Sequence, residues 1–162
     1  MDSFKDTEEI KGRLRYAALN FLARREHSRK ELSQKLLRQG DDESLIEEVI
    51  LALEQEGLQS DTRFAKMYAR ARFDKGLGPI RVSGELNERG IASELIDECL
   101  DEYEELWLDA MARVRQARFS ASRPATFSEQ AKQMRFLQYR GFSTGQIKQL
   151  FKTSAFLQED NH

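Results

Sequence analysis

The chain has 162 residues, of which 40% are hydrophobic and 33% are charged, and its formal net charge is −2. This length allows one ordinary domain or a short array of repeats, and the low Pro and Gly content (2 and 9 residues) favours helix over sheet or disorder. With one cysteine, Cys99, a disulfide framework and a cysteine-based metal site are excluded, and we expect this thiol to be buried.

Apolar residues at helical spacing, with clear end signals, predict nine helices and no strand. Capping boxes open two of them at Ser28 and Ser143, and Pro79 suits the first position of another. We expect Leu37, Met67 and Ala71 among the inward-facing residues. In chain order the helices should cover about 10–25, 28–40, 44–56, 64–75, 80–89, 93–105 and 106–118, and the last two should begin at 126 and 143.

A short segment recurs three times, at spacings of 50 and 51 residues. Its glycines are Gly40, Gly90 and Gly141, each preceded by a leucine at −4 and followed by an isoleucine at +6. Repetition at this period is typical of stacked units that bury an apolar face against their neighbours. We therefore predict an elongated, all-α tandem array of three three-helix repeats. The predicted limits are 1–57, 58–105 and 106–152, followed by a tail at 153–162.

Three positions depart from the repeat pattern. Asp41 follows the first glycine, whereas apolar residues follow the other two. Gln133 stands at a position that is apolar in the other repeats, and Gly84 lies inside a predicted helix. We expect weaker local packing at each of these positions.

Charge is distributed in blocks that follow the repeats. Such blocks fit either solvated helix faces or a modular surface for a partner that carries both signs, such as a protein assembled on nucleic acid. Binding to duplex DNA alone is less favoured, because it usually requires a clearly basic domain. The blocks are nine bases and two acids in 11–39, eight acids in 41–61, seven bases and three acids in 63–90, eight acids in 91–112, and nine bases and one acid in 113–152.

Side chains suited to catalysis are scarce. His27 and His162 are the only histidines, and neither belongs to a cluster with metal-ligand spacing. Residues 76–79 are not a phosphate-binding loop, because no strand precedes them and a proline removes one N–H. We predict that the protein is not an enzyme and uses no cofactor or metal. We expect the large aromatic side chains in the core or between repeats: Trp107, Tyr68, Tyr103 and Tyr139.

One nearly continuous block is more specific than this periodicity. It comprises the segments DTRFA (61–65), YARAR (68–72), KGLGPIR (75–81) and ELNERGI (85–91). The block resembles the middle repeat of the RecX regulatory proteins, the bacterial modulators of the RecA recombinase. The resemblance extends to LARREHSRKEL (22–32) and QMRFLQYRGF (133–142), and so covers roughly residues 12–152.

The resemblance implies a curved array that binds RecA filaments in or near their helical groove and restrains filament growth. Lower ATP hydrolysis, strand exchange and coprotease activity of the recombinase would follow, with roles in DNA repair, homologous recombination and the SOS response. The expected protein is a cytoplasmic monomer. No apolar run reaches the roughly 20 residues of a membrane span, and residues 1–6 lack the apolar segment of a signal peptide.

The basic face of the middle repeat is the predicted partner-binding site. Arginine pairs bidentately with carboxylate or phosphate, so this face fits acidic side chains of RecA or the DNA backbone. The alternative is that Arg70 or Arg72 only pairs with an acidic helix of its own or a neighbouring repeat. The candidate residues are Arg70, Arg72, Lys75, Arg81 and Arg89, with one acid, Asp74, among them.

Two other classes of function stay open. A helix-turn-helix regulator would bind duplex DNA sequence-specifically, with a steep dependence on salt. A passive helical scaffold would bind some other protein. Weak contact of a RecA regulator with single- or double-stranded DNA also remains an alternative.

Overall fold

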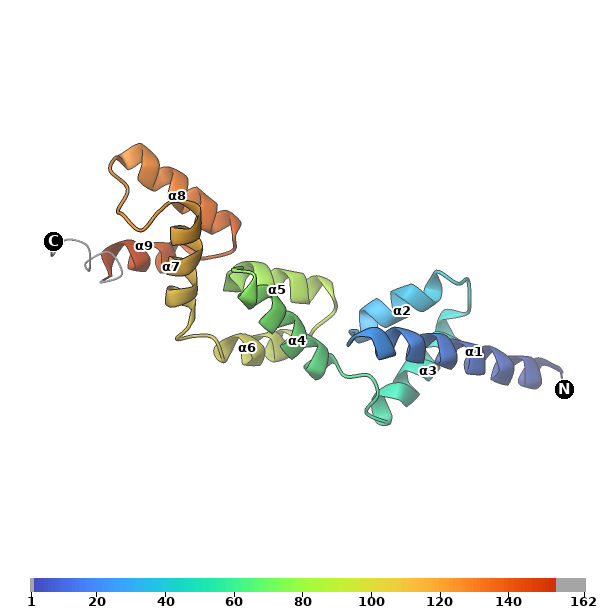
Figure 1. Ribbon diagram of the computed structural model, residues 1–162. Coiled ribbons are helices and arrows are strands. Elements are labelled where there is room, and N and C mark those ends of the chain that lie inside the picture. Colours follow the sequence, from blue (N-terminus) through green and yellow to red (C-terminus); the bar gives the residue numbers. More distant parts are fainter. Residues whose placement is uncertain (1, 154–162) are drawn as a thin grey trace. The chain divides into compact units, whose positions relative to one another are not determined.

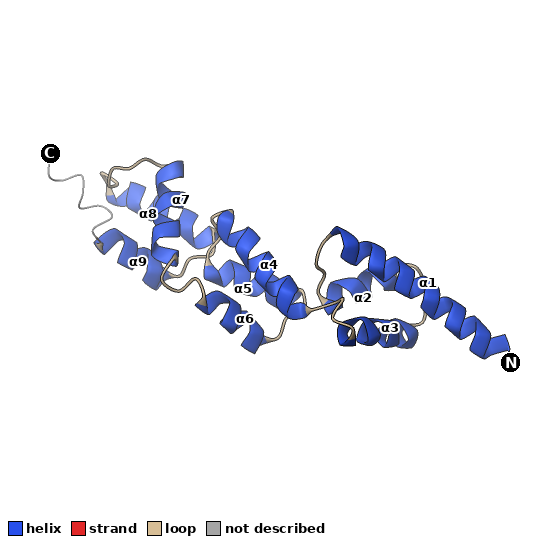
Figure 2. Cartoon of the chain, turned by 60° about the horizontal axis from the view of Figure 1, so that its bottom comes forward, coloured by secondary structure: helices blue, strands red, loops and turns tan. Residues whose placement is uncertain are grey.

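The computed structural model describes residues 2–153, and their regular structure consists of nine α-helices without a strand (Figure 1, Figure 2). This confirms the all-α prediction and the helix count over that part of the chain. Of the predicted tail at 153–162, all residues after 153 lie outside the described part of the chain. The helices are α1 (Asp2–Arg24), α2 (Arg29–Leu37), α3 (Glu43–Gln55), α4 (Asp61–Asp74), α5 (Pro79–Glu88), α6 (Ser93–Asp101), α7 (Trp107–Arg118), α8 (Phe127–Tyr139) and α9 (Thr144–Lys152).

The limits of α1 and α6 differ most from the prediction. α1 begins at Asp2 rather than near residue 10. The prediction missed its first turns because they are mostly polar and carry no apolar stripe. α6 ends at Asp101 rather than near residue 105. There the N–H groups of Tyr103 and Glu104 donate to carbonyls three residues back (3.0 and 3.2 Å), and this tightening ends the helix.

The predicted helix caps are present. Ser28 and Ser143 both form complete capping boxes, in which the serine Oγ accepts from the backbone N–H three residues on. Gly40 ends the turn after α2 with a positive φ of 84°, a conformation that glycine adopts without steric cost. Local sequence signals therefore place these helix ends correctly.

Three positions expected to face inward are exposed: Leu37, Met67 and Ala71. On α4 the fully buried residues include Phe64 and, instead of Met67 and Ala71, two alanines, Ala65 and Ala69. Both sets of positions satisfy helical spacing, so periodicity could not distinguish them. The expectation for these three side chains was wrong.

The chain divides into two compact units, one from Met1–Tyr68 and Asn87–Leu95 and the other from Ala69–Leu86 and Ile96–His162. All three boundaries between them fall inside the predicted middle repeat. Each unit contains one contact between consecutive repeats. The repeat limits 1–57, 58–105 and 106–152 remain a prediction.

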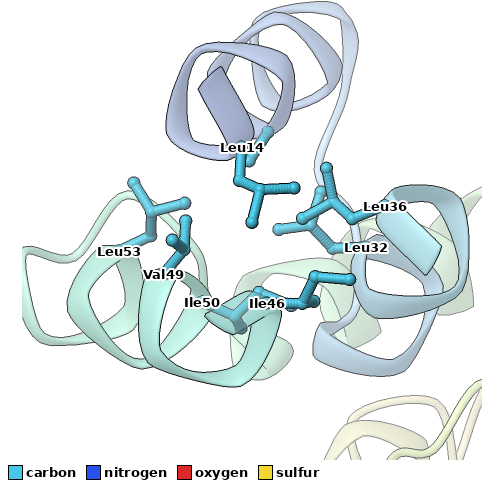
Figure 3. Packing of buried hydrophobic residues seen from close by; sticks show 8 residues of the cluster. Leu14, Leu32, Leu36, Ile46, Val49, Ile50 and Leu53 are labelled. Carbon is cyan, nitrogen blue, oxygen red and sulfur yellow. The ribbon is translucent and has the colours of Figure 1, made fainter. Parts of the chain in front are cut away.

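In the first unit, the buried residues of the cluster formed by α1, α2 and α3 are aliphatic. Leu14 of α1 points toward Leu32 and Leu36 of α2 and toward the apolar face of α3 (Figure 3). All three leucines are fully buried. Burial of each contributes roughly 1.5–3 kcal/mol to folding. The α3 side chains in this core are Ile46, Val49, Ile50 and Leu53.

The core of the second unit is aromatic at one end. Trp107 is 6% exposed, and its ring packs at 5.3 Å from Phe73 and 5.7 Å from Tyr103, measured between centroids. The ring centroid of Phe142 lies 6.3 Å from that of Trp107. The expected burial holds for Trp107 but not for Tyr139, which is 76% exposed.

Consecutive repeats meet at a contact that occurs once in each unit. In the first, a Cβ added to Gly90 would lie 2.8 Å from Lys30 Cβ, and Lys30 Nζ donates to the Glu88 carbonyl (3.0 Å). In the second, a Cβ on Gly141 would collide with Arg81. Lys30 and Arg81, like Gly90 and Gly141, are 51 residues apart. The same joint is therefore repeated at the period of the sequence.

In the second unit this joint also includes backbone hydrogen bonds. The Gly78 N–H donates to the Arg140 carbonyl (2.8 Å), and the Ile80 N–H donates to the Gly141 carbonyl (3.0 Å). A Cβ on Gly78 would lie 2.5 Å from the Gly141 backbone, so only glycine allows this approach. Residues 76–79 thus form a turn that attaches one repeat to the next, and not a phosphate-binding loop.

Candidate functional site

Arg70 and Lys75 are exposed at the C-terminal end of α4. Arg70 Nε lies 3.3 Å from Asp74 Oδ2, but both side chains are largely exposed (72% and 59%). An exposed pair of this kind contributes about 0–1 kcal/mol and breaks easily. Both cations can therefore bind a partner with little loss of folding free energy.

Arg72 and Arg81 share one carboxylate. Arg72 donates twice to Glu85 of α5, from Nε and Nη2 at 2.8 Å each, and Arg81 Nε lies 3.3 Å from the same group. Arg72 and Glu85 are only 22% and 18% exposed. The guanidinium of Arg81 also lies 5.5 Å from the ring centroid of Tyr139. Arg72 thus connects α4 to α5, and Arg81 connects α5 to Tyr139 at the end of α8. The carboxylate of Glu85 offsets part of their positive charge.

Arg89 belongs to the first unit, whereas the other four candidates belong to the second. Its guanidinium stacks 4.6 Å from the ring centroid of Tyr68 and lies 4.0 Å from Glu31. Burial opposes ionisation of Glu31, but hydrogen bonds from Arg25 and the Ser28 N–H outweigh it and lower the pKa of this carboxyl. Arg89 therefore faces a carboxylate that stays ionised.

The opposing charge blocks of the first repeat neutralise each other. Arg29 donates to Glu47 (2.9 Å) and Glu54 (2.8 Å) of α3, and Lys11 of α1 pairs with Glu48 (2.5 Å). In this repeat the basic and acidic blocks therefore pair with each other at the surface. Arg70 pairs with Asp74 of its own helix α4, and Arg72 pairs with Glu85 of α5.

The basic block of the third repeat forms a groove with the end of α4. The groove has a volume of about 350 Å³ and is lined on its cationic side by Lys75, Arg113, Arg118 and Arg140, with Asp74 as the acid. Its floor is apolar, from Gly76, Val114, Ala117 and Phe136. Arg140 Nη1 donates to the Lys75 carbonyl (3.2 Å), which ties the two walls together.

The groove extends the predicted site to residues that the sequence reasoning did not select. Arg113, Arg118 and Arg140 come from a different repeat than Lys75, so their proximity follows from the docking of residues 76–79 on the turn after α8. The available sequence signal was the excess of bases in 113–152. That signal identifies a basic repeat but not which bases converge.

A buried arginine, also not anticipated, organises the loop after α7. Arg115 is 3% exposed and donates to Gln133 Oε1 (2.9 Å) and to the carbonyls of Ser120 (3.0 Å) and Ser122 (2.5 Å). Ser120 has a φ of 147°, so the loop is held in an unusual conformation. Gln133, noted above as a polar residue at an apolar position, is thus the partner of a buried cation.

His27 is a structural side chain and is 2% exposed. Its Nδ1 lies 3.0 Å from the Arg25 carbonyl and its Nε2 lies 2.8 Å from Lys35 Nζ, so the neutral ring donates at Nδ1 and accepts at Nε2. Burial lowers the pKa of His27, and the positive charges of Arg25 and Lys35 lower it further. In the described part of the chain no group of three or more His, Cys, Asp or Glu side chains could hold a metal ion.

Comparison with known proteins identifies the family. Models of the first, second and third three-helix domains of RecX match residues 15–53, 60–100 and 104–151, in that order. The chain belongs to the RecX family. The three matches follow the three repeats and confirm the tandem three-helix architecture.

Relatives named "Regulatory protein RecX" cover most of the chain. The protein from Halorhodospira halophila is 46% identical over 135 residues, which are 83% of this chain and 84% of that protein. The protein from Pseudomonas putida is 42% identical over 137 residues, 85% of this chain and 88% of its own. These relatives are named as regulators.

A solved structure shares the fold. The crystal structure of RecX from Lactobacillus salivarius superimposes with a TM-score of 0.79 at 25% identity, over 90% of this chain and 96% of that one. Within residues 2–153 none of the helices combines the length and the apolar character that crossing a membrane requires.

Proposed function

We propose that this RecX-family protein binds RecA nucleoprotein filaments and restrains their extension, and so lowers ATP hydrolysis, strand exchange and coprotease activity. The observation that carries the proposal is the match of all three repeats, in order, to the RecX domains. RecA filaments form on DNA in the cytoplasm, where we expect the protein to act as a monomer.

The surface chemistry supports this proposal. A filament of protein on DNA presents both carboxylates and phosphates, and the second unit presents exposed arginine and lysine side chains to either. Arg70 and Lys75 are the most accessible of the predicted partner-binding residues in that unit. Arg72 and Arg81 contribute to the same face but also stabilise the fold through Glu85.

The test is single-strand-DNA-dependent ATP hydrolysis by RecA, titrated with this protein far below one copy per RecA subunit. Inhibition at such ratios is expected, because a protein that stops filament growth acts on many subunits at once. No inhibition by the folded protein would contradict the proposal. Sequence-specific retention of duplex DNA without RecA would instead support the helix-turn-helix alternative.

A double variant tests the predicted face. Charge reversal at Arg70 and Lys75 should weaken filament binding roughly tenfold while the melting temperature stays nearly unchanged, because neither side chain has a buried partner. Arg81 is less suitable for this test, since its reversal would also disturb Glu85 and the joint at Gly141. Full inhibition by the Arg70→Glu, Lys75→Glu protein would exclude this face as the binding surface.

A further inference from the structure

The groove of the second unit carries a strong excess of positive charge. Lys75, Arg113, Arg118 and Arg140 line it, and within residues 2–153 none of the four takes part in an ion pair. The one lining carboxylate, Asp74, is already paired with Arg70. The groove therefore lacks carboxylates to match its cations, unlike the basic helices of the first repeat.

Two of these cations are held in place by an aromatic ring. The guanidinium carbon atoms of Arg118 and Arg140 lie 5.9 and 5.5 Å from the ring centroid of Phe136. Arg140 is further fixed by its bond to the Lys75 carbonyl. Stacking on a ring leaves the N–H edges of a guanidinium available, and these edges fit the two oxygens of a carboxylate.

We infer that this groove receives an acidic segment of a protein partner, with carboxylates on Arg113, Arg118 and Arg140 and an apolar side chain on Val114 and Ala117. The inference rests on the proposed function, in which the partner is RecA. A volume of about 350 Å³ accommodates a few side chains, at the lower end of the range of about 300–1,000 Å³ for binding pockets.

A peptide fits the groove better than single-stranded nucleic acid does. Nucleic acid would place bases on exposed aromatic faces beside the cations. Phe136 is the only aromatic residue that lines this groove, and two guanidinium groups already stack on it. The apolar floor then has no role toward a phosphodiester backbone, whereas it can bury an apolar side chain of a peptide.

The first experiment measures binding of three probes to the full-length protein by fluorescence anisotropy. The probes are a labelled peptide of Glu-Glu-Leu repeats, the same peptide with Lys in place of Glu, and oligothymidylate of comparable charge. The groove variant is Arg113→Glu with Arg118→Glu. The control is Arg135→Glu with Lys148→Glu, which makes the same charge change at exposed positions outside the groove.

The wild-type protein should bind the acidic peptide and not the basic one. The groove variant should bind it at least about tenfold more weakly, and the control within about twofold of wild type. Equal loss in both variants would overturn the inference, since it would indicate general electrostatic attraction only. Preference for oligothymidylate that depends on Arg113 and Arg118 would also overturn it.

A second measurement locates the partner on the filament. A photo-crosslinking amino acid at Ala117, on the groove floor, should give adducts with an acidic segment of RecA and not with the DNA. Nucleotide adducts would contradict the inference. If the acidic peptide binds through the groove but wild-type protein does not bind RecA filaments, the groove assignment holds and the proposed function fails.

Discussion

Gly141 and Gly84 show how differently two glycines of one chain can respond to the same substitution. Gly141 has a φ of 102°, and a Cβ there would collide with Arg81 of the preceding repeat. We expect Gly141→Ala to destabilise the protein by about 1–3 kcal/mol, through backbone strain and loss of the joint. Urea unfolding monitored by circular dichroism measures this change.

Gly84 provides the matched control. It lies within α5, is exposed, and apart from its chain neighbours and the nearby backbone of its own helix has no atom within 4 Å of the site that a Cβ would occupy. Gly84→Ala should therefore stabilise the protein by about 0.5–1 kcal/mol, because alanine loses less conformational entropy in a helix. If the two alanine variants shifted stability in the same direction, the role assigned to the joint would be wrong.

His27 makes stability depend on pH. Its pKa in the folded protein is lowered by burial and by the neighbouring cations, whereas the unfolded chain titrates near the usual value of about 6.5. As the pH falls below about 6.5, the unfolded state binds the proton first, so stability that is fully present above this pH is lost progressively down to the folded pKa.

The measurement is the free energy of unfolding of wild type and His27→Gln between pH 7.5 and 5.5. Wild type should lose stability on acidification, and the variant should lose less. The lowered pKa of Glu31 affects stability only below about 4.5 and so does not interfere in this range. In the wild-type protein, titration of the His27 ring protons by NMR should give a midpoint below 6.5; a higher midpoint would refute the explanation.

At the scale of elements, one buried side chain, Arg115, binds two carbonyls of the loop between α7 and α8. Arg115→Met would leave the carbonyls of Ser120 and Ser122 and the amide of Gln133 without their donor. We expect a loss of about 2–4 kcal/mol and faster proteolysis within residues 119–126. Arg135→Met, at an exposed position of α8, should change neither. Unchanged protease resistance of the Arg115 variant would show that the loop is held by other contacts.

At the scale of the whole molecule, each unit contains an apolar cluster of its own, and the only tryptophan of the chain, Trp107, lies in that of the second unit. Leu14→Ala should remove about 2–5 kcal/mol from the first unit. We expect this variant to lower the unfolding midpoint measured by circular dichroism, while the midpoint of Trp107 fluorescence stays close to wild type. Leu137→Ala, in the core around Trp107, should lower the fluorescence midpoint. Equal shifts of both signals in both variants would indicate one cooperative unit.

Local structure was largely predictable from the sequence. Helical periodicity, the capping boxes at Ser28 and Ser143 and the glycine turns depend on residues within one or two turns of each other. Such interactions leave a direct trace in the order of residues. The start of α1 was missed because its first turns carry no apolar stripe.

The sequence by itself determined the family, the all-α class and the three-repeat plan. The period of about 50 residues and the helix signals depend only on the order of residues along the chain. Tertiary structure alone decided which charges pair. Glu85 of α5 binds Arg72 of α4, and the α3 acids bind α1 and α2, by contacts between helices that helical spacing does not specify. The groove likewise exists only because the turn at Gly78 brings Lys75 of one repeat beside the arginines of the next.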